Sequence, residues 1–346
     1  MSTFVRDETE FVAEVLDEYG AQVRVAMAEY LKPREPRRYL YNMVSDYPRR
    51  GGRMLRPTLC LAAARALGAE ADAAVRTAVA IELLHNAFLV HDDVEDESDT
   101  RRGRPTLNAL HGSSTAVNVG DALIMLGMKA LLDNAEPLGL PLAMRILVDA
   151  EQMVRETIEG QAIELGWRQD NAVHLREADY LSMIMKKTCW YTTIFPLRAG
   201  ALVSRSDVNV DRLIRFGFFA GAAFQIQDDL LNLLGDPVKY GKELNGDLRE
   251  GKRTLMLIHL LEHAEPSERA RLEELLSRPR SARTEDDVLW IRRGMIAHGS
   301  IEYAERMAHG LAGAAQHAFD EIFAGIPDSR DLLFLRGVVR WVLART

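Results

Sequence analysis

The chain has 346 residues, 47% of them hydrophobic, which is enough for one large domain or two smaller ones. Its 51 acidic residues outnumber its 43 basic ones, and the net charge of -8 argues against nucleic acid as a partner. Two cysteines, Cys60 and Cys189, are too few for a disulfide framework and fit a reducing compartment. The N-terminus lacks a signal-peptide pattern and no long apolar run occurs, so we expect a cytoplasmic protein without a membrane span.

Apolar residues recur with the helical period along almost the whole chain, and no alternating run typical of a strand is evident. Linkers are short and the composition does not shift, which favours one all-α domain over residues 1–346. A basic loop at 47–53 and a polar, glycine-bearing loop at 235–253 interrupt the helices. The expected helices lie at 9–31, 57–67, 71–98, 113–133, 141–167, 177–204, 208–234, 254–263, 266–276, 285–297, 299–324 and 328–344.

The predicted helix 71–98 ends in a cluster of acids that includes Asp92, Asp93 and Asp96. Asp92 and Asp96 lie one turn apart on the same helical face. Carboxylates are unfavourable at a helix C-terminus because the helix dipole is negative there. The cluster therefore indicates a compensating cation, and oxygen ligands suit Mg²⁺ better than zinc. Taken alone, the same acids also fit an ordinary solvated helix end.

A second acidic cluster, with Asp228, Asp229 and Asn232, closes the predicted helix 208–234. Spacings of three and four place Gln225, Asp228 and Asn232 on one face, and Gly221 below them leaves room for another backbone or a ligand. A second acidic helix end far along the chain favours a metal site over two unrelated solvated ends.

Arginines accompany these acids. Arg101, Arg102 and Arg104 follow the first cluster, and Arg53 and Arg56 flank a Gly-Gly loop at a predicted helix start. Guanidinium groups bind phosphate oxygens in bidentate fashion, and helix N-termini accept anions. The pattern predicts that metal and phosphate are bound together. Neutralisation of nearby acids is the alternative interpretation of Arg101 and Arg102.

Together these motifs resemble the trans-isoprenyl diphosphate synthases of the polyprenyl synthetase family, over nearly the whole chain and most firmly from 51 to 254. The first aspartate motif is 92–96, followed by Arg101-Arg102-Gly103; the second is 224–232; Lys187-Thr188 stands between them. The loop 51–57 resembles the family's glycine–arginine loop. The resemblance implies an all-α bundle of the isoprenoid-synthase type, with the active-site cavity between two aspartate-bearing helices. It also implies two to three Mg²⁺ ions, isopentenyl diphosphate and an allylic diphosphate as substrates, and a homodimer.

The resemblance also implies a role for each matching residue. The metal ligands would be Asp92, Asp96 and Asp228, with Asp93, Asp229, Asn232 and Glu164 as further candidates. The allylic diphosphate would be bound by Arg101, Lys187 and Lys242. The diphosphate of isopentenyl diphosphate would be bound by Arg53, Arg56, His85 and Arg102. Thr188 and Gln225 would face the reacting carbons, and Lys242, Asp247 and Lys252 belong to a loop that would fold over the diphosphate.

Three positions depart from the family pattern: Asn232 and Glu164 each stand where Asp is usual, and Arg53-Met54 stands where Lys-Arg is usual. Asn232 lacks charge, so we expect weaker support for the third metal ion and not a loss of activity. By itself, His85 would more often be a buried, hydrogen-bonded histidine. Its position two turns before Asp92 favours substrate binding.

Product length is expected to be set by the apolar residues that precede Asp92. Phe88 lies about 6 Å and Leu84 about 12 Å from Asp92 along a helix axis, at about 1.5 Å per residue. Phe88 is the candidate floor, and the small Ala87 leaves one side open. Short-chain members of the family often carry bulk at both positions, so the expected product is geranylgeranyl diphosphate (C20), with C15, C25 and longer chains as alternatives. Plain core packing is the alternative role of Phe88.

Other classes share parts of this pattern. The residues 92–96 also fit the motif of squalene and phytoene synthases, but the sequel Arg101-Arg102-Gly103 and the pair Lys187-Thr188 argue against those enzymes. A class I terpene cyclase would carry a second metal motif that is not found. A non-catalytic partner subunit typically loses the first motif, which is intact here; only Asn232 supports that interpretation.

Overall fold

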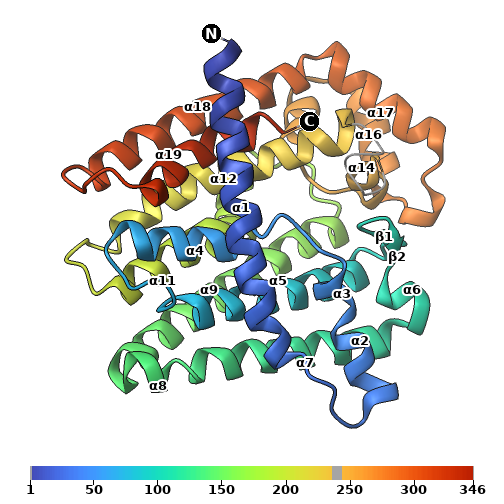
Figure 1. The fold of residues 1–346 in the computed structure, drawn as a ribbon. Coiled ribbons are helices and arrows are strands. Elements are labelled where there is room, and N and C mark those ends of the chain that lie inside the picture. The colour runs from blue at the N-terminus through green and yellow to red at the C-terminus, as the bar shows by residue number, and fades with distance from the viewer. Residues whose placement is uncertain (1, 236–243, 346) are drawn as a thin grey trace.

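The regular structure is almost entirely helical, as predicted (Figure 1). The computed structural model describes residues 2–235 and 244–345, so Lys242 lies outside the described residues. The α-helices are α1 (Ser2–Tyr30), α2 (Asn42–Val44), α3 (Asp46–Arg49), α4 (Leu55–Ala66), α5 (Val75–Glu95), α6 (Leu107–His111), α7 (Ser113–Leu132), α8 (Ala135–Leu138), α9 (Leu140–Gln169), α10 (Glu177–Ile184), α11 (Phe195–Ser204), α12 (Arg212–Leu234), α14 (Gly246–Glu250), α15 (Leu255–His263), α16 (Pro266–Ser277), α17 (Glu285–Ala297), α18 (Ser300–Ile322) and α19 (Arg330–Leu343). Two π-helical segments, η1 (Arg37–Tyr41) and η2 (Met185–Ile194), and a 3-10 turn, η3 (Arg280–Ala282), complete them.

The two aspartate-bearing helices, α5 and α12, lie inside the bundle. In Figure 1, α1 crosses the front, α7 runs along the lower edge, and α18 runs along the upper edge with α19 below it. Helix α5 packs mainly on α7 and α4, and α12 packs mainly on α18 and η2. Asp92 of α5 and Asp228 of α12 line one cavity inside this bundle.

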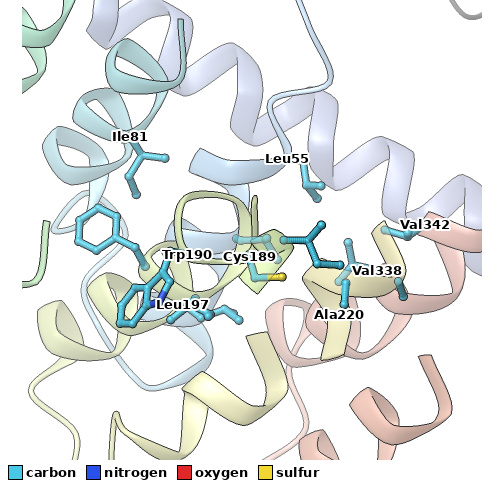
Figure 2. Close-up of a cluster of buried hydrophobic side chains, with 14 of the residues drawn as sticks. Leu55, Ile81, Cys189, Trp190, Leu197, Ala220, Val338 and Val342 are labelled. Atoms are coloured by element: carbon cyan, nitrogen blue, oxygen red, sulfur yellow. The ribbon is translucent and has the colours of Figure 1, made fainter. Parts of the chain in front are cut away.

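The segment η2 lies between α9 and α12, and glycines make this packing possible. A Cβ on Gly160 of α9 would lie 2.2 Å from the Lys187 backbone nitrogen, and one on Gly221 of α12 would lie 3.0 Å from the Cα of Cys189. The room that the sequence analysis assigned to Gly221 is thus filled by another backbone. Figure 2 shows Cys189 and Trp190 of η2 within the buried apolar cluster.

Both cysteines are buried and free, and burial raises the pKa of each thiol. Thiols in such surroundings are unreactive. Caps define several helix starts, as their sequences favour. The Thr254 hydroxyl accepts from Leu257 N at the start of α15, and the Ser329 hydroxyl accepts from Leu332 N at the start of α19.

Local features differ from the sequence prediction: the short helices α3 and α14 overlap the loops expected at 47–53 and 235–253. The stretch expected as one helix at 177–204 is divided into α10, the π-helical η2 and α11. A short antiparallel hairpin, β1 (Thr100–Arg101) with β2 (Arg104–Pro105), lies where no strand was expected. Gly103, at φ 70°, forms its turn. The hairpin is only two residues per strand, too short for an alternating pattern to reveal it.

One helical stretch, Ser113–Leu138, is long and apolar enough by length and composition to cross a membrane, which the sequence analysis did not anticipate. Of its most apolar window, 44% is buried inside the fold. This stretch includes α7, whose inner face packs against α5. A helix of the protein core passes the same test of length and composition.

Candidate active site

A cavity of about 710 Å³ lies between α5, α9, η2 and α12. The polar part of its lining includes Asp92, Asp228 and Asp229 of the two acidic motifs and most of the predicted basic residues. The apolar part of its lining includes Phe88, Leu89, Ile124, Ile158, Met183 and Ile184. Such a cavity suits an amphipathic ligand with an anionic head and a hydrocarbon tail.

The first acidic motif lies at the C-terminal end of α5, where Asp92 and Asp93 play different parts. Asp92 lines the cavity; its carboxylate lies 3.2 Å from Arg101 Nη2 and 3.6 Å from Lys187 Nζ. Asp93 is fully buried, and its carboxylate accepts from Tyr47 Oη at 2.5 Å and from Arg101 Nε at 2.9 Å. Asp92 therefore faces the ligand space, while Asp93 fixes Arg101 from behind.

Asp96, just beyond the end of α5, is buried between two cations. Its carboxylate lies 2.9 Å from Arg168 Nη1 and 2.8 Å from Lys252 Nζ. Burial is the largest influence on Asp96 and opposes its ionisation, but Lys252, Lys187 and Arg168 together hold the pKa of Asp96 below its ordinary value. Asp96 and Asp92 both line a small polar pocket beside the main cavity. The acids at this helix end are thus compensated by cations, as the helix dipole requires.

The second motif lies near the C-terminal end of α12 and begins with Asp228, which lines the cavity. Its carboxylate lies 3.2 Å from Nη1 of Arg345, beyond the end of α19. The Arg345 guanidinium also lies 4.3 Å from the Phe224 ring centre, and Gln227 Nε2 donates to the Arg345 carbonyl at 3.2 Å. The C-terminal end of the described chain therefore reaches into the site.

Asp229 also lines the cavity, and its carboxylate is hydrogen-bonded on both oxygens. It accepts from Tyr180 Oη at 2.8 Å and from Gln225 Nε2 at 2.7 Å. Burial, with a contribution from the nearby charge of Asp247, raises the pKa of Asp229 to about 8. The Gln225 carbonyl in turn accepts from Thr188 Oγ1 at 2.8 Å. Thr188 and Gln225, predicted to act together, are therefore in direct contact.

Asn232 connects α12 to the polar loop. Its side-chain oxygen accepts from the backbone amide of Asp247 at 3.1 Å, and its carbonyl accepts from Asn245 N at 2.8 Å. Asn232 is buried and lines the small polar pocket with Asp96. In this arrangement the amide oxygen anchors α14.

The arginines predicted for the second diphosphate also line the cavity. Arg56 donates from Nη2 to Thr192 Oγ1 at 2.9 Å, and its Nη1 lies 3.3 Å from His85 Nε2. Arg53 lies over the Trp341 ring at 5.2 Å, and Arg102 donates to the Gly51 carbonyl. These arginines and His85 line the same cavity as Asp92 and Asp228.

Lys187 joins two of the predicted acids. Its Nζ lies 2.6 Å from Glu164 Oε1 and 3.6 Å from Asp92 Oδ1. Burial alone would lower the pKa of Lys187, but Glu164 and Asp92 raise it above the ordinary value. Glu164, a further metal candidate, is therefore engaged with Lys187. The extra methylene relative to Asp lets its carboxylate reach across from α9.

The apolar part of the cavity supports one chain-length residue and not the other two. Phe88 lines the cavity, whereas Leu84 and Ala87 are 1% and 0% exposed and lie in the core, outside the described cavity lining. Leu84 instead packs on Gly127 of α7. Ile124 of α7 and Ile158 of α9, which the sequence analysis did not select, contribute the remaining wall.

The residues present fit a cation such as Mg²⁺. Asp92 and Asp228 present oxygen ligands to one cavity, and Asp96 lies beside it. Within residues 2–235 and 244–345, no three acidic, histidine or cysteine side chains converge on one metal-sized position. Each of the three aspartates instead faces a lysine or arginine. Bound cations would therefore replace protein cations at these carboxylates.

Sequence reasoning missed several residues of the site. Tyr47, Arg168, Tyr180 and Arg345 each donate to an aspartate of the motifs or form an ion pair with one. Tyr191 and Trp341 line the cavity. None of them lies within the motifs that carried the prediction. Tyr47, Arg168 and Tyr191 lie closest to the predicted residues in the sequence, four positions from Gly51, Glu164 and Lys187 respectively.

The fold and the paired acidic helices define an isoprenoid-synthase type of bundle. Residues 37–292 match the polyprenyl synthetase family, and the chain belongs to that family. It is 34% identical to a geranylgeranyl pyrophosphate synthase from Geoglobus acetivorans, over 72% of this chain and 77% of that one. It is 32% identical to an octaprenyl diphosphate synthase from Escherichia coli, over 77% and 78%.

Solved structures agree with this assignment. A geranylgeranyl pyrophosphate synthetase from Pyrococcus horikoshii Ot3 aligns with a TM-score of 0.85 and 29% identity, over 97% of this chain and 99% of that one. A polyprenyl synthase from Caulobacter crescentus CB15, complexed with calcium and isoprenyl diphosphate, aligns with a TM-score of 0.85 and 27% identity, over 97% and 98%. The relatives' names cover several product lengths, so the family alone does not assign one.

Proposed function

We propose that this protein condenses isopentenyl diphosphate with an allylic diphosphate, head to tail and in the trans configuration. The products are a longer prenyl diphosphate and free diphosphate, and the main prenyl product is geranylgeranyl diphosphate (C20). Farnesyl (C15) and C25 or longer products are the alternatives. The observation that carries the proposal is a single cavity that joins Asp92 and Asp228, a group of arginines and an apolar extension.

The reaction depends on Mg²⁺, with two to three ions held by Asp92, Asp96 and Asp228. When bound, Mg²⁺ supplies charge neutralisation for the departing diphosphate. Asp93 does not reach this position, because its side chain is fully buried behind Arg101 and Tyr47 and does not line the cavity. Asp229, Asn232 and Glu164 support the ligands through the hydrogen bonds and the ion pair described above.

The protein's own residues perform the remaining tasks. Lys187 and Arg101 place positive charge beside Asp92, where the allylic C–O bond breaks and negative charge develops. The π electrons of isopentenyl diphosphate then form the new C–C bond, and a C–H bond releases a proton. The departing diphosphate accepts that proton. Thr188 and Gln225, hydrogen-bonded to each other, orient their dipoles toward the allylic cation.

The product length follows from the apolar part of the cavity. We place the end of the growing chain at Phe88, with Ile124 and Ile158 as neighbouring walls. Ala87 and Leu84 act indirectly, through the packing of α5 on α7. A cavity of about 710 Å³ that also holds diphosphates accommodates a medium chain, and this supports C20.

We further propose that the protein is a homodimer in which exposed apolar residues of α7 and α9 form the interface. These neighbouring helices expose Met125, Leu132, Leu140, Met144, Val148 and Ile158. Such a surface requires a covering partner. In this proposal the exposed apolar face of α7 contacts a second copy of the chain and not a lipid bilayer, as expected of a cytoplasmic enzyme. Light scattering of the purified protein should give twice the chain mass of 38.8 kDa, and a monomeric mass would contradict this part.

The proposal is tested by incubating the protein with isopentenyl diphosphate, Mg²⁺ and allylic primers of several lengths. We expect an elongated prenyl diphosphate, and no product after chelation of the metal. A cyclised hydrocarbon would indicate a terpene cyclase. Absence of any product, with restored synthesis only after addition of another synthase, would indicate a non-catalytic partner subunit.

A further inference from the structure

Tyr191, in the π-helical segment η2, has no role in the proposed reaction but contacts three residues that do. Its ring stacks on the His85 imidazole, with centres 5.9 Å apart and an angle of 24° between planes. It meets the Phe88 ring edge-on at 5.6 Å. The Arg56 guanidinium lies 4.5 Å from its centre. One aromatic ring therefore connects two residues assigned to a diphosphate with the candidate floor of the tail pocket.

The Arg56 side chain is held from several directions at this point. Besides the Tyr191 ring, it is bound by Thr192 Oγ1 at 2.9 Å and lies 3.3 Å from His85 Nε2. A free arginine side chain loses substantial rotamer entropy when it is fixed on a ligand. Contacts that fix the guanidinium before the ligand arrives remove this cost from binding.

The backbone that carries Tyr191 is itself confined. The segment η2 is packed against α9 and α12, and glycines allow the closest approaches, at Gly160 and Gly221. π-helical turns are rare and occur frequently at functional sites. The ring position is thus fixed by the fold, and it can orient the more flexible Arg56.

We propose that Tyr191 is a positioning residue for the diphosphate of isopentenyl diphosphate, and that it acts through Arg56 and His85. This inference rests on the proposed function. The π face of the ring attracts the guanidinium and stacks on the imidazole, so the two cavity-lining groups point at one phosphate position. The ring is the active feature, and the hydroxyl is not required.

Two variants distinguish the effect of the aromatic face of Tyr191 from the effect of its side-chain volume. Tyr191→Phe keeps the aromatic face, and Tyr191→Leu keeps apolar volume but removes that face. We expect Tyr191→Leu to raise the KM for isopentenyl diphosphate about tenfold, with smaller changes in kcat and in the KM for the allylic primer. Tyr191→Phe should stay within about twofold of the unmodified protein.

A binding measurement without turnover provides the second readout. Calorimetric titration with isopentenyl diphosphate in the presence of a chelator reports the arginine-based anion site alone. Tyr191→Leu should weaken this binding about tenfold, and should cause no further loss in an Arg56→Gln background, because both changes remove the same interaction. If Tyr191→Leu does not fold, Tyr191→Met provides a second non-aromatic variant with an adaptable side chain.

Tyr303→Leu is the matched control. Tyr303 also stacks on a histidine, His259, with ring centres 4.4 Å apart, but it does not line the cavity. Its loss should leave both KM values unchanged. Unchanged affinity for isopentenyl diphosphate in a folded Tyr191→Leu or Tyr191→Met protein would overturn the inference, as would equal loss for both substrates or equal damage by Tyr191→Phe. If the unmodified protein elongates no primer, the proposed function fails instead.

Discussion

The carboxylate of Asp228 lies 3.2 Å from the guanidinium of Arg345, so the end of the described chain contacts the second aspartate motif. Sequence separation hides this relationship, because the two residues are 117 positions apart. The contact places a protein cation where the proposed function requires a metal ion. Arg345 and Mg²⁺ should therefore compete for Asp228.

Replacing Arg345 tests this competition. Arg345→Ala should lower the Mg²⁺ concentration that gives half-maximal activity by up to about fivefold, the range of a partly exposed ion pair. Arg340→Ala is the control, since Arg340 pairs with Glu8 at 3.1 Å on the surface. An unchanged or increased Mg²⁺ requirement in Arg345→Ala would show that the contact does not oppose metal binding.

Asp92 and Asp93 should separate activity from stability. Asp93→Asn leaves the buried Arg101 guanidinium without its main counter-charge and should reduce the free energy of unfolding by ~3–5 kcal/mol. Asp92→Asn changes a partly exposed group and should abolish most activity with little change in stability. Urea unfolding and primer elongation of both variants provide the comparison. Equal stability of the two variants would contradict the structural role assigned to Asp93.

The tail pocket predicts two opposite changes in product length. Phe88→Ala removes the candidate floor and should shift the product from C20 to C25 or longer. Ile124→Phe adds bulk to the same wall and should shift it to C15. Ala87→Val should mainly lower stability, because Ala87 is fully buried in close packing. Chromatography of the products measures their chain lengths. An unchanged chain-length distribution in both Phe88→Ala and Ile124→Phe would show that other residues form the floor of the tail pocket.

Asn232 offers a test of the departure from the family pattern. Asn232→Asp keeps an acceptor for the Asp247 amide and adds charge beside Asp228, so the Mg²⁺ requirement should fall. Asn232→Leu removes the acceptor, should loosen α14, and should reduce activity by about tenfold or more, since a buried amide is left unpaired. Limited proteolysis measures this loosening: the 244–253 region should be cleaved faster in Asn232→Leu than in the unmodified protein. Equal activity of Asn232→Leu and the unmodified protein would argue against the anchoring role.

Much of the fold could be predicted because helical periodicity and local stop signals are encoded in the sequence. The predicted helix 285–297 agrees with α17, and 208–234 differs from α12 only at its start. The π-helical η2 could not be predicted, since its backbone depends on packing between α9 and α12 through Gly160 and Gly221. Local propensity carries no such information.

The positions of the site residues could be predicted where they belong to a sequence motif. Their roles could not be predicted where those roles depend on contacts with residues far away in the sequence. Asp92 and Asp228 line the cavity as expected. Tertiary contacts determine three other roles. Asp93 accepts a hydrogen bond from Tyr47, Glu164 pairs with Lys187, and Asn232 accepts from the Asp247 amide. Ala87 shows the same limit: the helical spacing places it near Phe88, but the neighbouring helix α7 buries it.

The most direct test is the product assay with isopentenyl diphosphate, Mg²⁺ and allylic primers, run beside Asp92→Asn. We predict that the unmodified protein forms an elongated prenyl diphosphate with C20 as the main chain length, and that Asp92→Asn forms almost none. Absence of elongation from every primer, by folded protein with Mg²⁺ present, would contradict the account.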